Sequence, residues 1–235
     1  MTPQRPTRRS HRSWRDWVLA VVGSTSSGRA HVFRRMYRLN RWSSSETVSG
    51  VGSDLEQTAA VRRELPAMLV RHHIKSLVDA PCGDLFWLSQ VAGLELDSYV
   101  GVDIVPELVD RLSSATPIPN AEFRRLDVIS DPLPKADAIL CRDLLVHLNY
   151  QQIYKCLRNF RASGSTYLLV TTFPQQANAD IVSGRWRPVN LRAEPFSFPE
   201  PLDSIIEGNT QRNARLGLSY GDKSLALWRL ADLPL

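Results

Sequence analysis

The sequence predicts an α/β fold built on a mostly parallel sheet, and two strand-like stretches carry that prediction. Residues 75–84 (KSLVDAPCGD) read as a short buried strand that runs into a tight turn, with a proline and a glycine limiting its length. Residues 98–102 (SYVGV) form a second such run, which ends at Asp103, 24 residues after Asp79. A helix between the two would complete a βαβ unit, the repeating element of a parallel sheet.

The other elements are predicted in chain order from capping residues and apolar spacing. Ser53 and Glu56 form a capping box that opens a helix ending near Arg71, kinked by Pro66. Leucines and a valine three residues apart predict a helix over 85–91. Two further helices are expected over 106–112 and 150–161. Strands are expected over 122–126, 136–141 and 167–172, with a pair of edge strands over 202–207 and 224–230.

The chemistry of the first turn can be argued from charge. An acid such as Asp103, at a strand end after a glycine-bearing turn, is typical of an adenosine site, where it accepts hydrogen bonds from ribose hydroxyls. The turn lacks the G-x-G-x-x-G fingerprint of pyrophosphate binding and is flanked by Asp79 and Asp84. Two carboxylates repel a pyrophosphate but attract an ammonium and a sulfonium, so charge favours S-adenosylmethionine over NAD.

The turn from Asp79 to Gly83 resembles the first motif of the class I S-adenosylmethionine-dependent methyltransferases, an acid-x-Gly-x-Gly loop, with Pro81 where a glycine is usual. The chain also resembles a mostly uncharacterised bacterial subgroup of that superfamily. The resemblance is carried by four segments, VSGVGSDLEQT, DAPCGDLFWL, CRDLLVHL and GRWRPVNL. The resemblance implies a Rossmann-like class I methyltransferase domain over residues 53–235, with a mostly parallel seven-stranded sheet and helices on both faces. Residues 1–52 would be a basic arm and lid segment.

The resemblance also implies where the cofactor lies. Asp127, at the end of the third strand, would accept the adenine amino group beside the amide of Val128, although a role as a helix or turn cap is the alternative. The full set of expected cofactor contacts is Asp79, Ala80, Pro81, Gly83, Asp84, Asp103, Ile104, Asp127, Val128 and Arg142.

The fourth strand delivers further polar residues to the carboxyl edge of the sheet, where open α/β folds bind ligands. Methyl transfer requires alignment of the acceptor and exclusion of water, and an alcohol acceptor also needs a base. A neutral imidazole can take a proton at physiological pH, so His147 is the candidate base. Asp143 would orient it or contact the methionine end of the cofactor, whereas capping or packing is the alternative for His147.

The acceptor is less constrained. The proline-rich connection over 173–201 has the length of a functional loop, and its phrase GRWRPVNL offers planar and polar groups that suit a sugar face or an acidic metabolite. Alternatively, Trp186 and Phe196 only fasten the loop to the core. An Asn-Pro-Pro-Tyr motif, typical of amino methyltransferases, is absent after the fourth strand. The expected substrate-binding residues are Arg185, Trp186, Arg187 and Asn190.

We therefore expect O-methylation of a small molecule or a sugar hydroxyl. A methyltransferase for a macromolecule (RNA or protein) and a non-catalytic, cofactor-binding regulatory protein remain alternatives. The substituted glycine at Pro81 is the main support for the latter.

Charge is concentrated at the N-terminus. The chain carries a net charge of +5, but residues 1–41 hold ten arginines against the single Asp16, so they carry +9 and the remainder −4. Residues 1–16 are expected to be disordered. Residues 14–22 are expected to be either an amphipathic helix, which touches a membrane surface weakly or in a eukaryote acts as a transit peptide, or a solvated arm. A helix is expected over 30–39, and its apolar stripe favours docking onto the domain over recognition of nucleic acid. The Ser- and Gly-rich segment 42–53 is expected to be either a cover over the ligand site or a plain linker.

The cysteines bear on compartment and metal chemistry. Cys82, Cys141 and Cys156 form no C-x-x-C pair, and with no secretory leader they predict free thiols in a reducing compartment. The longest early apolar stretch, residues 17–22, is far shorter than the roughly 20 residues that span a bilayer. A cytoplasmic protein without a bound metal is expected.

Overall fold

The computed structural model describes residues 24–115, 118–210, 212–213 and 218–235. The predictions for the first 23 residues, a disordered arm and an amphipathic helix, lie outside this range. Within it, no helix is long and apolar enough to cross a membrane.

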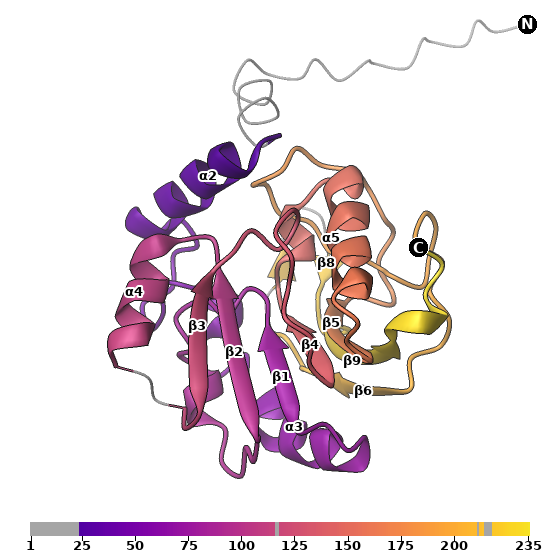
Figure 1. Cartoon of the computed structure of the whole chain (residues 1–235). Helices are drawn as coiled ribbons and strands as arrows, with labels where there is room; N and C mark the ends of the chain where they lie inside the picture. Colours follow the sequence, from indigo (N-terminus) through magenta and orange to yellow (C-terminus); the bar gives the residue numbers. More distant parts are fainter. Residues whose placement is uncertain (1–23, 116–117, 211, 214–217) are drawn as a thin grey trace, which may run out of the picture.

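Seven strands form one sheet in the order β3-β2-β1-β4-β5-β9-β6 (Figure 1). The first five in this order are parallel, and β9 is antiparallel to both β5 and β6. The strands span Ser76–Asp79 (β1), Ser98–Asp103 (β2), Ala121–Arg125 (β3), Ala138–Cys141 (β4), Tyr167–Thr172 (β5), Asp203–Ile206 (β6) and Ser224–Arg229 (β9). The predicted mostly parallel seven-stranded sheet and its closing pair of edge strands are confirmed.

Helices cover both faces of the sheet, because successive residues of each central strand point to opposite sides. Leu77 and Leu140 pack with the helix α3 (Ala59–Arg71), whereas Val78 and Ile139 pack with α5 (Tyr150–Ala162). The side chain of Asn149 caps α5 by accepting a hydrogen bond from the Gln152 amide at 2.9 Å, as the sequence predicts. Helix α4 (Pro106–Ser114) follows β2 and packs against β2 and β3.

Helix α2 (Ser26–Arg38) lies beyond the carboxyl ends of β2 and β3 (Figure 1). It begins four residues earlier than the predicted 30–39 segment because the Thr25 hydroxyl caps it, accepting from the Gly28 amide at 3.2 Å. Short 3₁₀ segments lie at Val51–Ser53 (η1), Leu88–Gln90 (η2), Leu145–His147 (η3) and Leu230–Asp232 (η4). A separate two-stranded sheet pairs β7 (Arg212–Asn213) with β8 (Leu218–Ser219).

Two of the helix predictions are wrong. Residues 85–91 form only the 3₁₀ segment η2, because the chain leaves the first turn through Leu85 in a left-handed conformation (φ 60°). The apolar spacing of this segment correctly indicates buried side chains, since Leu88 is only 1% exposed. The capping box is also not formed: α3 begins at Ala59 after Thr58, and Ser53 ends η1 instead.

Candidate functional site

A cavity lies at the carboxyl edge of the sheet. Its walls come from the turn after β1, the residues that follow β2, β3 and β4, and two covering segments, α2 and residues 42–53. Of the predicted site residues, it is lined by Asp79, Pro81, Gly83, Asp84, Asp103, Ile104, Asp127, Val128, Arg142, Asp143 and His147. Ala80 is fully buried and is not part of the lining.

Asp103 joins the first turn to the end of β2. Its carboxylate accepts hydrogen bonds from the amides of Gly83 at 3.2 Å and Val105 at 2.9 Å. Burial raises the pKa of Asp103 to about 6, although these two hydrogen bonds act to lower it. The carboxylate is therefore fixed in place by backbone groups on both sides.

Asp79 ends β1 and lies beneath the same turn. The hydroxyl of Tyr99 donates to its carboxylate at 2.7 Å. Burial raises the pKa of Asp79 to about 7, against the effect of the tyrosine hydrogen bond and with a further contribution from the charge of Asp103. Asp79 therefore titrates near neutrality.

Asp84 fastens the covering segment to the first turn. Its carboxylate accepts hydrogen bonds from the Thr47 hydroxyl (2.6 Å), the Val48 amide (3.1 Å) and the Ser49 hydroxyl (2.8 Å). Gly83 has a φ of +55°, and a Cβ there would lie 2.5 Å from the Ser49 hydroxyl oxygen, so the close approach requires glycine. The segment over 42–53 is therefore held against the turn and contributes Trp42, Val48, Ser49 and Ser53 to the cavity wall.

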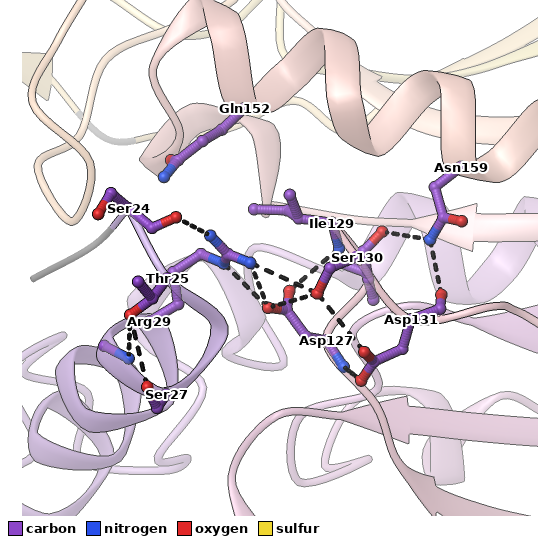
Figure 2. Close-up of polar contacts among 12 residues, drawn as sticks. Ser24, Thr25, Ser27, Arg29, Asp127, Ile129, Ser130, Asp131, Gln152 and Asn159 are labelled. Carbon is purple, nitrogen blue, oxygen red and sulfur yellow. Dashed lines mark hydrogen bonds and ion pairs between the residues drawn. The ribbon is translucent and has the colours of Figure 1, made fainter.

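Asp127, just beyond β3, is bonded to helix α2 (Figure 2). Its Oδ2 accepts hydrogen bonds from Arg29 Nε at 2.9 Å and Nη2 at 2.6 Å, and from the Ser130 hydroxyl at 3.2 Å. Its Oδ1 accepts from the Ile129 amide at 3.1 Å. The carboxylate thus caps its own turn, as the alternative expectation has it, while also lining the cavity.

Four charged residues next to the ends of β4, β6 and β9 form a network in which only Asp143 is partly exposed. Arg142 Nη2 lies 2.5 Å from Glu207 Oε2 and donates to the Gly52 carbonyl at 2.6 Å. Lys223 Nζ lies 2.6 Å from Asp143 Oδ2 and 3.3 Å from Glu207 Oε2. Burial would raise the pKa of Asp143, but the charges of Lys223 and Arg142 outweigh it and hold the pKa below its ordinary value.

His147, the last residue of η3, has one ring nitrogen committed to the backbone. Its Nδ1 lies 3.0 Å from the carbonyl oxygen of Arg185. Because a carbonyl only accepts, this hydrogen bond assigns the proton to Nδ1 and leaves Nε2 as the basic nitrogen. Burial lowers the pKa of His147, against the effect of the Arg185 hydrogen bond, so the ring is neutral at physiological pH.

The predicted substrate-binding residues do not line the cavity. Arg187 donates to the carbonyls of Leu145 and Leu148, both at 2.7 Å, and Asn190 donates to the carbonyl of Pro174 at 2.8 Å. Both side chains therefore hold the long loop. Trp186 packs edge-on against Phe173 and Tyr220, and Phe196 packs against Tyr150 and Tyr154, which agrees with the alternative that these aromatics fasten the loop.

Several residues at or next to the site were missed by the sequence reasoning, among them Glu207, Lys223, Trp42 and Arg29. Glu207 and Lys223 stand at the facing ends of the two predicted edge strands, so that pairing was the signal that would have brought them together. Trp42 belongs to the expected cover, and its ring lies 6.0 Å from that of His147. Arg29 gave no signal beyond its place in a predominantly basic region.

Among the described residues, no group of three or more potential ligands is arranged to hold a metal ion. No protein-family model matches the chain. No curated protein matches it either.

Solved structures do match. A 1,6-didemethyltoxoflavin-N1-methyltransferase from Burkholderia thailandensis, with bound 1,6-didemethyltoxoflavin and S-adenosylhomocysteine, aligns with a TM-score of 0.51 at 18% identity, covering 88% of this chain and 90% of that one. The N-methyltransferase NodS from Bradyrhizobium japonicum WM9 gives 0.46 at 14% identity, over 71% and 94% of the two chains. Magnesium protoporphyrin IX methyltransferase from Synechocystis PCC 6803, with bound S-adenosylhomocysteine, gives 0.45 at 17% identity, over 62% and 73%.

The strand order of the sheet and the similarity to the Burkholderia enzyme indicate the same fold. The chain has the Rossmann-like fold of the class I S-adenosylmethionine-dependent methyltransferases.

Proposed function

We propose that this protein is an S-adenosylmethionine-dependent methyltransferase that acts on a small molecule. The observation that carries the proposal is Asp103, which two backbone amides hold at the end of β2 and which lines the cavity at the point where class I enzymes bind ribose. The Burkholderia enzyme with this fold was crystallised with a small molecule and S-adenosylhomocysteine, which is consistent with the proposal.

The charge of the cavity fits this cofactor. Five aspartates line it against two arginines, Arg29 and Arg142. Even with Asp79 partly protonated at neutral pH, such a wall attracts the ammonium and sulfonium groups of S-adenosylmethionine and repels a pyrophosphate. In the proposed complex Asp103 binds the ribose hydroxyls, and Asp127 and the Val128 amide bind adenine. Asp79, Gly83 and the segment after β4 would border the methionine end.

His147 is the proposed base for a hydroxyl acceptor. When bound, S-adenosylmethionine supplies a methyl group on a cationic sulfur. His147 Nε2 would take the proton of the acceptor hydroxyl as its oxygen is methylated, so that no proton is released without a positioned acceptor. The Arg185 carbonyl, hydrogen-bonded to Nδ1, stabilises the imidazolium that results.

The aromatic side chains beside His147 bear on the acceptor. Phe33 and Trp42 stack with centroids 6.5 Å apart, and both line the cavity with Tyr37. Such walls favour an acceptor with a flat apolar face, either an aromatic ring or the apolar face of a sugar. Because Arg187 and Asn190 hold the loop, we now propose Phe33, Trp42 and Tyr37 in their place as the acceptor contacts.

The three cysteines are free and buried, which is consistent with the proposed cytoplasmic location. The proposal includes neither a nucleic-acid partner nor a metal.

The direct test is methyl transfer itself. The full chain is incubated with S-adenosylmethionine and a panel of phenols, sugars and heteroaromatic amines, and S-adenosylhomocysteine formation is measured. The proposal expects turnover with at least one hydroxyl acceptor. Release of product only with amines would overturn O-methylation, and cofactor binding without turnover on any acceptor would favour the regulatory protein.

A further inference from the structure

Arg29 and Asp127 form an ion pair that is buried and joins residues 98 positions apart in the chain (Figure 2). The two side chains are 7% and 3% exposed. Arg29 Nη1 donates to the Ser24 carbonyl at 3.1 Å, so the guanidinium also bonds the start of its own helix. A buried guanidinium without such partners would be strongly unfavourable, so this contact fixes how α2 docks.

The docked helix turns one face toward the cavity. Arg29, Phe33 and Tyr37 are spaced four residues apart, which places them on one side of α2, and all three line the cavity. On the neighbouring side, Arg34 and Arg38 form exposed ion pairs with Glu107 at the start of α4. Exposed ion pairs of this kind contribute little to stability, so the buried pair of Arg29 is the principal polar contact that holds the helix in place.

The anchor also orients the acid expected at the adenine. Oδ2 of Asp127 is occupied by Arg29 and Ser130, whereas among the described residues Oδ1 accepts one hydrogen bond, from the Ile129 amide. A carboxylate oxygen can accept two hydrogen bonds, so Oδ1 keeps the capacity to accept one from an exocyclic amino group.

We propose that Arg29 is a positioning residue of the cofactor site, through which docking of α2 and binding of the adenosine moiety stabilise one another. The inference rests on the proposed function and adds a reciprocal coupling to it. If the ligand favours the docked helix, the docked helix must favour the ligand by the same factor. Helix α2 is then part of the cofactor site, although its Arg29 lies 50 residues before Asp79, where the first motif begins.

The first experiment uses the wild-type full chain and S-adenosylhomocysteine as the probe. Hydrogen exchange of the amides over residues 26–38 is measured with and without the ligand. The coupling predicts slower exchange in α2 when the ligand is bound. Unchanged exchange in α2 with a saturating ligand overturns the inference, and no variant has to fold for that result.

The second experiment compares Arg29→Met with Arg35→Met, which removes the same charge from an exposed position of the same helix. Arg29→Met should bind S-adenosylhomocysteine on the order of tenfold more weakly than wild type, which is within the usual range of coupling between sites. Arg35→Met, the control, should bind it with an affinity within about twofold of wild type. Arg29→Lys, which keeps the charge but loses the two-nitrogen contact, should fall between them.

A double-mutant cycle separates this role from general destabilisation. If Arg29 acts through Asp127, adding Arg29→Met to Asp127→Asn should weaken binding far less than it does in the wild-type background. Additive effects, or an Arg29→Met variant that binds like wild type, overturn the inference while the proposed function stands. Failure of the folded wild type to bind S-adenosylhomocysteine refutes the proposed function instead.

Discussion

His147 carries the chemical step in this account. Replacing it with alanine should lower kcat for a hydroxyl acceptor by about 10²–10⁴-fold, because the proton then has no positioned acceptor. Affinity for S-adenosylhomocysteine should stay unchanged, and His31→Ala, at an exposed position of α2, serves as the control. Near-wild-type turnover of His147→Ala would remove the residue from the mechanism.

The pH dependence of kcat offers an independent check on the same residue. Because burial lowers the pKa of His147 below its usual value of 6.5, the imidazole becomes protonated only in more acid solution. At saturating cofactor and acceptor, kcat should fall on acidification as Nε2 gains a proton, with its half-maximal value below pH 6.5. A rising limb above pH 7 would show that another group is titrating.

Asp79 should make the stability of the fold depend on pH. Its pKa rises from an ordinary 3.8 to about 7 in the folded chain, chiefly through burial, so folding favours the protonated form. The stabilisation is complete below about pH 4 and is lost as the pH rises to about 7, a loss of up to about 4 kcal/mol at 1.36 kcal/mol per pKa unit.

Urea unfolding of wild type and Asp79→Asn between pH 4 and 8 measures this dependence. The variant should lose the part of the decrease in the free energy of unfolding that Asp79 contributes, which extends to about pH 7, and keep the part from Asp103, whose pKa is about 6. Asp97→Asn, at an exposed position, should retain the whole decrease. Parallel curves for wild type and Asp79→Asn would mean that Asp79 is ionised throughout this range.

Single elements differ in how well their sequence predicts them. Strands β1, β2 and β5 are apolar runs of the right length between turn residues, and the structure confirms them. The helix predicted over 85–91 is not formed. An apolar residue at every third position indicates that one side of the segment is buried, but this burial does not require an α-helix. The 3₁₀ segment η2 achieves that burial after a turn that the left-handed Leu85 determines.

Elements far apart in the sequence meet in the charge network. Glu207, just after β6, bonds Arg142 after β4 and Lys223 before β9, and its side chain is fully buried. Glu207→Gln should lower the free energy of unfolding by about 3–5 kcal/mol, because two buried cations then share one carboxylate. The control is Glu200→Gln, whose exposed pair with Arg192 should contribute at most about 1 kcal/mol. Equal effects of the two in urea unfolding would contradict a structural role for the network.

At the scale of the whole molecule, the alternation of strand and helix signals predicted a parallel α/β sheet, and the resemblance to the class I methyltransferases implied its seven strands; the strand order comes from the structure. The same logic predicted which acids reach the carboxyl edge, because each follows a strand. It could not predict Arg29, whose contact with Asp127 depends on how α2 docks in three dimensions. Nor could it tell that Arg187 and Asn190 hold the loop, since backbone carbonyls as partners leave no trace in the sequence.

The central claim is that this cavity binds S-adenosylmethionine through Asp103. The most direct test is calorimetric titration of S-adenosylmethionine into the folded wild-type protein and into Asp103→Ala. The account predicts micromolar binding to wild type and its loss in the variant, with the fold of the variant checked by circular dichroism. Absence of binding to the folded wild type, or equal binding to both proteins, would contradict it.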